Sequence, residues 1–98
     1  MTDKLKKWLE NSPNAEMVEK LIAESMAGNY QVKRKSVEIM LHPRLGPFAI
    51  TEYGTIFFVP SNIERIAQVG DELYIYTRAN WIFVYDLSTG ELKDIAQE

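Results

Sequence analysis

The sequence predicts a single α+β domain, 1–98, in which an N-terminal helical segment of two helices packs on one face of a mostly antiparallel β-meander of five to seven strands. Three observations favour this fold class. Apolar residues recur with a helical period up to residue 28 and with a period near two after residue 30. Turn signals that contain glycine follow at short intervals in the second half, as hairpins require. The length of 98 residues fits one domain, with 1–28 helical and 30–96 in the sheet.

Two helices are expected in the helical segment. The first covers residues 3–10, where Leu5, Trp8 and Leu9 share one face. An Asn-Ser-Pro-Asn break separates it from the second helix, because Ser caps a helix N-terminus and Pro is tolerated at the first helical position. Gly28 is the expected stop. The apolar stripe of the second helix, wide enough to cover a sheet face, is Met17, Val18, Leu21, Ile22, Ser25 and Met26.

Strands are expected from the alternation of apolar and polar residues after Gly28. Residues 42–47 are expected to form a loop, because two prolines and a glycine in six residues interrupt a strand ladder. Hairpins follow, each with its own turn signal. The expected strand pairs are 48–52 with 55–59 around Tyr53-Gly54, 63–69 with 72–78 around Gly70-Asp71, 72–78 with the strand that follows Ala79-Asn80, and that strand with 91–95 around Ser88-Thr89-Gly90.

Counting outward from these turns predicts which residues lie opposite one another. We assume two-residue turns at 70–71 and 79–80 and a three-residue turn at 88–90. The predicted pairs are Arg78 with Trp81, Tyr76 with Phe83, Tyr74 with Tyr85, Ala67 with Tyr74, Arg65 with Tyr76, Ile95 with Phe83 and Lys93 with Tyr85.

This register gives the sheet two different faces. We assign the aliphatic face to the core beneath the helices, because its side chains carry almost no polar atoms. Tyrosine hydroxyls need water or partners, and cations are seldom fully buried, so the other face is expected to point away. The aliphatic face is Leu73, Ile75, Thr77, Ile66, Ile82, Val84 and Leu92. The aromatic–cationic face is Tyr74, Tyr76, Trp81, Phe83, Tyr85, Arg65 and Arg78.

The aromatic–cationic face favours a small, non-catalytic protein-interaction module, such as an adaptor, inhibitor or regulator. Tyr, Trp and Arg are enriched at binding hot spots. The partner is expected to be another protein or a second copy, which would give a homodimer. The alternative is that these rings are core, packed against Trp8, Tyr30 or the 48–59 hairpin with the cations reaching the rim.

A second function class is the binding of single-stranded nucleic acid by the same face. Rings beside cations stack on bases, and the basic run Lys33, Arg34 and Lys35 could contact phosphates. The charge balance disfavours this class, because the net charge is -3 and backbone binding draws on dense positive charge.

A third class is a small enzyme or ligand binder centred on the His42–Arg44 loop, with Glu52 and Tyr53 nearby. It predicts a concave pocket at that loop. His42 is the only histidine, and the sequence has no spacing typical of a nucleophile, base and orienting group. We therefore expect no enzyme activity, no catalytic residue, no metal site and no cofactor.

Composition narrows the classes further. The chain contains no cysteine, which excludes disulfides, thiolate catalysis and Cys-based metal sites. Met1-Thr2-Asp3-Lys4 is not followed by the apolar stretch of a signal peptide, and no run approaches the ~20 apolar residues of a membrane span. The expectation is a cytoplasmic protein without a membrane partner.

Overall fold

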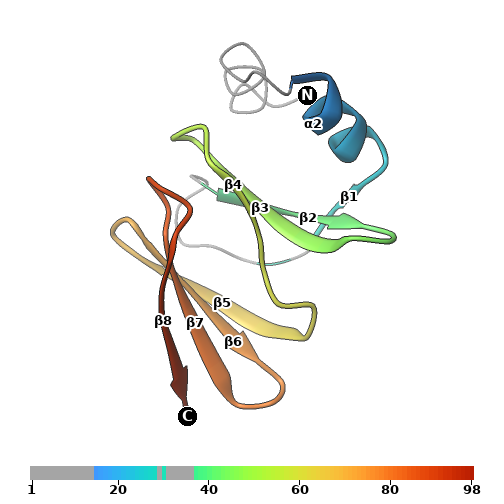
Figure 1. The fold of residues 1–98 in the computed structure, drawn as a ribbon. Helices are drawn as coiled ribbons and strands as arrows, with labels where there is room; N and C mark the ends of the chain where they lie inside the picture. Colours follow the sequence, from blue (N-terminus) through green and yellow to red (C-terminus); the bar gives the residue numbers. More distant parts are fainter. Residues whose placement is uncertain (1–14, 29, 31–36) are drawn as a thin grey trace.

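The computed structural model describes residues 15–28, 30 and 37–98. Within these residues the fold is mostly β, with one helix and two four-stranded antiparallel sheets (Figure 1). The helix is α2 (Ala15–Ala23). Sheet A has the order β1 (Met26–Ala27), β2 (Val37–His42), β3 (Gly46–Thr51) and β4 (Ile56–Phe58). Sheet B has the order β5 (Ile63–Val69), β6 (Glu72–Thr77), β7 (Trp81–Asp86) and β8 (Leu92–Gln97).

The elements form three layers, with α2 on one face of sheet A and sheet B on the other (Figure 1). The larger core lies between the sheets, where side chains from both inner faces meet. Its buried members are Val37, Ile39, Ala49, Val59, Ile63, Leu73, Ile75, Tyr85 and Leu87. A smaller core lies beneath the helix, where Leu21 and Ile22 pack against Phe48 and Ile50.

Strand β3 joins the two cores because both of its faces are buried. Phe48 and Ile50 belong to the core beneath α2, whereas Ala49 belongs to the core between the sheets. Thr51 is also fully buried, and its hydroxyl donates to the carbonyl oxygen of Leu87, the residue directly after β7 of sheet B, at 3.2 Å. The strand therefore fixes the spacing of all three layers.

The predicted fold class is wrong in its architecture. The described residues form eight strands in two stacked sheets and one helix, in place of two helices on a single meander. Leu73 and Ile75 are core, as expected, but they lie beneath sheet A and not beneath the helix. The reason is that β3 offers apolar side chains on both faces, so the helix and sheet B can each cover one of them. The helix predicted over 3–10 lies outside the described residues.

The second helix is shorter than predicted, since α2 ends at Ala23 and not at Gly28. The Ser25 hydroxyl donates to the Leu21 carbonyl oxygen at 2.6 Å, and the Ser25 N–H bonds to the Ile22 carbonyl at 3.0 Å, which tightens the last turn. The next two residues then form β1 and pair with β2. The start signal for this helix also lies outside the described residues.

The predicted loop 42–47 is wrong at both ends. His42 and Gly46 are paired as the last residue of β2 and the first of β3, so only residues 43–45 form the turn. Pro47 is tolerated in β3 because its missing N–H removes a donor but leaves its carbonyl, which accepts from the Val59 N–H at 3.1 Å.

Two predicted hairpins are confirmed. Strands β3 and β4 pair around the Tyr53-Gly54 turn. Strands β5 and β6 pair around Gly70-Asp71 with Ala67 opposite Tyr74 and Arg65 opposite Tyr76, as counted from the sequence. Gly70 has φ +59°, which explains why glycine stands there.

The predicted register of β6 and β7 is wrong by one residue, because the turn between them has three residues, 78–80, and not two. Asn80 adopts φ +64°, the left-handed conformation that a three-residue hairpin loop requires. The Thr77 hydroxyl accepts a hydrogen bond from the Trp81 N–H at 3.1 Å and closes the turn. Tyr85 therefore lies opposite Leu73, and Tyr76 lies opposite Ile82.

The register of β7 and β8 is confirmed at Ile95, which lies opposite Phe83. It is wrong at Tyr85, which pairs with Leu92 and not with Lys93, because β8 is irregular at this point and contains one unpaired residue. Gly90 has φ +77° and occupies the left-handed position that was predicted for it.

Candidate functional site

The predicted aromatic–cationic face does not form as one surface. The one-residue shift at the 78–80 turn sends every side chain of β7 to the face opposite the expected one. Tyr74, Tyr76 and Arg65 therefore lie on the outer face of sheet B, beside Ile82 and Val84. The other members lie elsewhere: Trp81, Phe83 and Tyr85 are on the inner face, and Arg78 is in the turn.

The inner-face rings fit the alternative expectation in which they pack against the 48–59 hairpin. Tyr85 is buried and stacks on Phe57 of β4, with ring centroids 4.8 Å apart and an interplanar angle of 24°. Burial raises the pKa of the Tyr85 hydroxyl above its usual 10.0. Tyr30 and Phe83 are half-buried against the same core. Packing in the core between the sheets therefore accounts for these three rings without a binding role.

The outer-face rings of sheet B are engaged by neighbours in their own sheet. The Arg65 guanidinium lies 3.7 Å from the centroid of the Tyr76 ring and occupies one face of it. Tyr74 and Tyr76 are both half-buried. A base or a partner ring would have to displace Arg65 to stack on that face of Tyr76.

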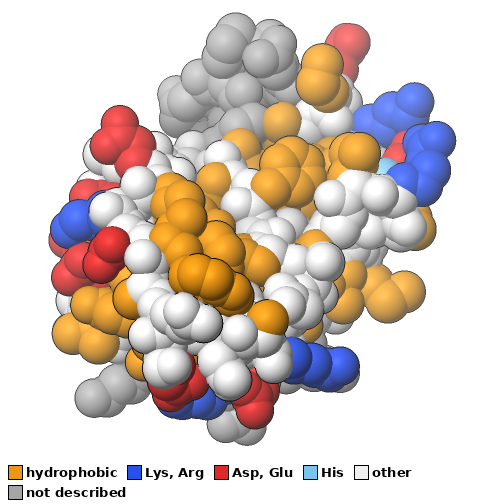
Figure 2. All heavy atoms as spheres, turned by 60° about the horizontal axis from the view of Figure 1, so that its bottom comes forward, with side chains coloured by type: hydrophobic (Ala, Val, Ile, Leu, Met, Phe, Trp, Pro, Cys, Tyr) orange, Lys and Arg blue, Asp and Glu red, His pale blue; other side chains and the backbone are white. Residues whose placement is uncertain are grey.

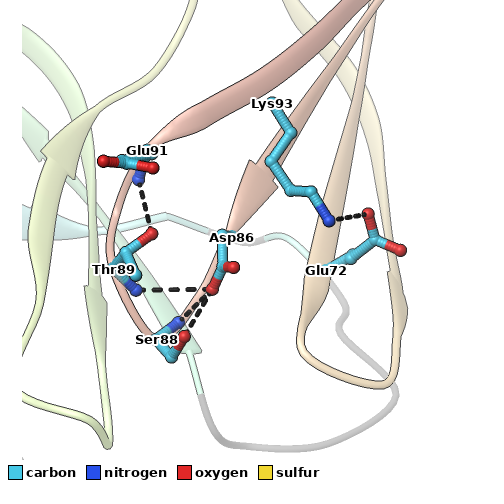
Figure 3. A network of polar contacts seen from close by, with 6 residues as sticks. All are labelled: Glu72, Asp86, Ser88, Thr89, Glu91 and Lys93. Carbon is cyan, nitrogen blue, oxygen red and sulfur yellow. Dashed lines mark hydrogen bonds and ion pairs between the residues drawn. The ribbon is translucent and has the colours of Figure 1, made fainter.

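The acidic end of the outer face is a capped turn (Figure 3). The Asp86 carboxylate accepts hydrogen bonds from the Ser88 hydroxyl at 2.6 Å and from the Ser88 and Thr89 N–H groups at 2.8 and 3.3 Å. These bonds hold the pKa of the Asp86 carboxyl below its usual 3.8. Lys93 pairs with Glu72 at 3.0 Å, and this contact raises the pKa of the Lys93 ammonium. These groups are satisfied within the fold.

Exposed large hydrophobic side chains gather at two places. The first is a groove beside α2, where Met17, Leu45 and Phe58 are 70, 59 and 53% exposed. The second is the inner face of β7 and β8, where Trp81, Leu92 and Ile95 are exposed. Figure 2 brings the lower end of Figure 1 forward and shows hydrophobic side chains gathered across that end of the molecule.

The groove has a volume of about 630 Å³ and lies between α2, β4 and the β2–β3 turn. This volume is within the usual range for binding pockets. Its lining is mainly aliphatic and aromatic, with charged groups from the C-terminal half of α2 and from the turn. The lining residues are Met17, Val18, Lys20, Leu21, Glu24, His42, Arg44, Leu45, Ile56, Phe57 and Phe58.

The groove walls arise from two different periodicities. In α2, Val18 is buried while Met17, one position earlier, points outward onto the rim. In β4, successive side chains take opposite sides, so Phe57 packs on Tyr85 whereas Phe58 packs on the helix side. The Phe58 ring meets Phe48 edge-on, with centroids 6.0 Å apart. This contact fixes Phe58 in place while leaving half of it open.

His42 organises the charged part of the groove. Its Nδ1 accepts hydrogen bonds from the Arg44 N–H at 3.2 Å and from the Leu45 N–H at 3.0 Å. Pro43 has no N–H, so these are the first donors that the turn offers. Because Nδ1 is an acceptor, Nε2 carries the ring proton, and this N–H donates a hydrogen bond to the Glu24 carboxylate at 2.8 Å. The ring therefore joins the β2–β3 turn to the end of α2.

The charges near His42 leave an excess of positive charge. The hydrogen bond from His42, followed by the nearby Lys20 and Arg44, holds the pKa of the Glu24 carboxyl below its usual 4.5. Lys20 and Arg44 contribute two cations against the one carboxylate. This part of the groove is therefore positive although the whole chain has a net charge of -3.

This arrangement is suited to binding more than to catalysis. His42 is buried, and both of its ring nitrogens are engaged, one by Glu24 and the other by the turn. A general base needs a free nitrogen within reach of its substrate. In the described part of the chain, no group of three or more His, Cys, Asp or Glu side chains could hold a metal ion.

The sequence located one end of this site and missed the rest. His42 and Arg44 were secondary candidates and do lie at a concave surface, as the third function class requires. Met17, Leu45 and Phe58 were not singled out. Two signals in the sequence were available. One is the apolar Leu45 in a turn that contains Pro and Gly. The other is the adjacent pair Phe57-Phe58, since consecutive strand residues cannot both face one core. The candidates Lys33, Arg34 and Lys35 lie outside the described residues.

Comparison with family models, curated proteins and solved structures found no match to this chain. No helix among the described residues is long and apolar enough to cross a membrane. The groove and the charges around it are therefore the basis for proposing a function.

Proposed function

We propose that this chain is a small, non-catalytic interaction module that binds an apolar segment of a partner protein in the groove between α2 and β4. The observation that carries the proposal is the exposure of Met17, Leu45 and Phe58 around one concave surface. Apolar side chains gathered at a hollow, and not scattered singly, are typical of interaction sites. Such grooves take amphipathic protein segments through a few anchoring side chains.

The openness of the walls favours a protein segment over a small molecule. Small-molecule pockets cover most of the surface of their ligand. Here the three rim side chains are each more than half exposed in the free chain, so the groove is open along this rim. An elongated segment can cover this rim, and burying three such side chains is worth several kcal/mol before ordering costs.

The other two function classes receive less support. Engagement of both His42 nitrogens argues against an enzyme centred on that residue. The position of Arg65 over the Tyr76 ring argues against base stacking at that ring, and the rings of β7 face the other way. A protein partner at the outer face of sheet B would meet mainly half-buried side chains.

The test is selection of binders from a random peptide library displayed on phage, with the purified chain as target. We expect enriched peptides whose binding is lost in Met17→Lys and Phe58→Lys and is retained in Val69→Lys. Val69 is the matched control, because it is 63% exposed and lies outside the groove. Circular dichroism should show all three variants folded. Selected peptides that bind the groove variants as well as the parent chain would refute the proposal.

A further inference from the structure

We propose that the segment bound in the groove carries carboxylates beside its apolar anchors, and that Lys20 and Arg44 recognise them. This inference rests on the proposed function and adds the chemistry of the partner. It identifies the occupant as an acidic, apolar protein segment, with Asp or Glu next to the side chains that contact Met17, Leu45 and Phe58.

The first support is that neither cation forms a close ion pair with any residue that the structure describes. Within the described part of the chain, neither Lys20 nor Arg44 has a carboxylate oxygen within 4.0 Å, whereas Lys93 and Arg65 each have one. Both cations line the groove. Both are therefore placed to meet an incoming anion in the groove.

The second support is the way in which the one nearby carboxylate is held. Glu24 accepts the hydrogen bond from the buried His42 ring at 2.8 Å. Glu24 lies one helical turn beyond Lys20, and its carboxylate is directed to the end of β2 and not to the lysine. His42 thus acts as a positioning residue, because its bond to Glu24 leaves the ammonium and the guanidinium free to face a ligand.

The third support is the contrast between the groove and the rest of the surface. The described residues after 36 carry nine Asp or Glu against four Lys or Arg. Within residues 37–98 this balance repels an acidic partner from most of the surface, whereas Lys20 and Arg44 place two cations together at the groove. Complementary charge of this kind selects the partner and speeds its association more than it raises the affinity.

The experiment compares two charge reversals with a matched control. Lys20→Glu and Arg44→Glu should each weaken the binding of library-selected peptides about 3- to 10-fold at low salt, by fluorescence anisotropy. Raising the salt to about 0.5 M should reduce this difference, because salt screens exposed charges. Arg78→Glu makes the same change in the β6–β7 turn, away from the groove, and should leave the affinity unchanged.

The outcomes separate this inference from the proposed function. Acidic, apolar peptides that bind the groove and respond to both charge reversals would support it. Neutral or basic peptides that lose binding in Phe58→Lys but not in Lys20→Glu or Arg44→Glu would overturn the inference and leave the proposed function in place. Peptides that are insensitive to Phe58→Lys would overturn both.

Discussion

The buried ring of His42 donates a hydrogen bond to the Glu24 carboxylate, 2.8 Å away, and so joins the last residue of β2 to the turn that ends α2. The Nδ1 atom of the same ring accepts hydrogen bonds from two backbone N–H groups of the β2–β3 turn. One side chain thus connects two walls of the groove. The Nδ1–H tautomer is incompatible with the bond to Glu24 and with the bonds from the turn. Which ring nitrogen carries the proton is therefore a test of this geometry.

We expect His42 to be in the Nε2–H tautomer. Nδ1 is an acceptor for the Arg44 and Leu45 N–H groups, and a proton on that nitrogen would oppose two donors. The long-range ¹⁵N–¹H correlation pattern of the imidazole distinguishes the two tautomers directly. Observation of the Nδ1–H tautomer in the folded chain would contradict the described turn.

Two isosteric variants separate the two roles of His42. Asn places an oxygen near the position of Nδ1 and can keep the turn bonds, whereas Gln places an amide N–H₂ near the position of Nε2 and can keep the bond to Glu24. In His42→Asn the pKa of Glu24 should rise toward its usual 4.5, and in His42→Gln it should stay lower. Carboxyl ¹³C shifts followed by NMR measure both, and equal pKa values in the two variants would show that the His42 bond is not the cause.

Acid should weaken the folded state through Glu24. Its carboxyl has a lowered pKa in the folded chain, so its ionised form stabilises the fold. This contribution is present above the unfolded value, near 4.5, and is lost as the pH falls through the lower folded value. Urea unfolding at several pH values, with Glu24→Gln as comparison, measures it. The variant should lose less stability than the parent chain over that acidic interval, and parallel losses in both would count against the assignment.

The layer arrangement predicts unequal effects of one substitution at two leucines of sheet B. Leu73 is fully buried between the sheets, whereas Leu92 is 46% exposed. Leu73→Ala should lower the free energy of unfolding by about 2–5 kcal/mol, and Leu92→Ala by about 1 kcal/mol or less. Chemical denaturation followed by tryptophan fluorescence measures both. Similar losses would mean that sheet A does not cover Leu73.

Asp94 is expected to protect the free edge of sheet B. Strand β8 is an edge strand, and the Ile95 N–H donates to the Asp94 side chain at 2.9 Å. Asp94→Ala would expose that N–H beside the apolar Leu92 and Ile95, which is the arrangement that promotes strand pairing between molecules. Light scattering should show increased self-association. Glu52→Ala, in the exposed β3–β4 turn, is the charge-matched control and should not change the mass.

Local features of the sequence predicted hairpins well because their causes are local. The Gly70-Asp71 turn needs a residue with positive φ, and the resulting register of Arg65 and Tyr76 is confirmed. The length of the 78–80 turn was predicted wrongly, because Ala79-Asn80 is equally compatible with two- and three-residue loops. The hydrogen bond from the Trp81 N–H to the Thr77 hydroxyl favours the three-residue loop. One residue in a turn changes the face of a whole strand.

The layer arrangement was harder to predict because it depends on distant segments. Whether one sheet or two forms is decided by β3, where Pro47 to Thr51 are all buried. A continuous apolar run of this kind is typical of a strand covered on both faces, and it could have indicated a third layer. The groove follows from that arrangement, because Phe57 faces sheet B and stacks on Tyr85, which leaves the next residue, Phe58, on the helix side.

Peptide binding in the groove is tested most directly by NMR chemical-shift mapping of the chain with a library-selected peptide. Binding in the groove should place the largest shift changes on Met17, Leu45 and Phe58, together with Lys20 and Arg44. Changes confined to Tyr74, Tyr76 and Ile82, on the outer face of sheet B, would contradict it.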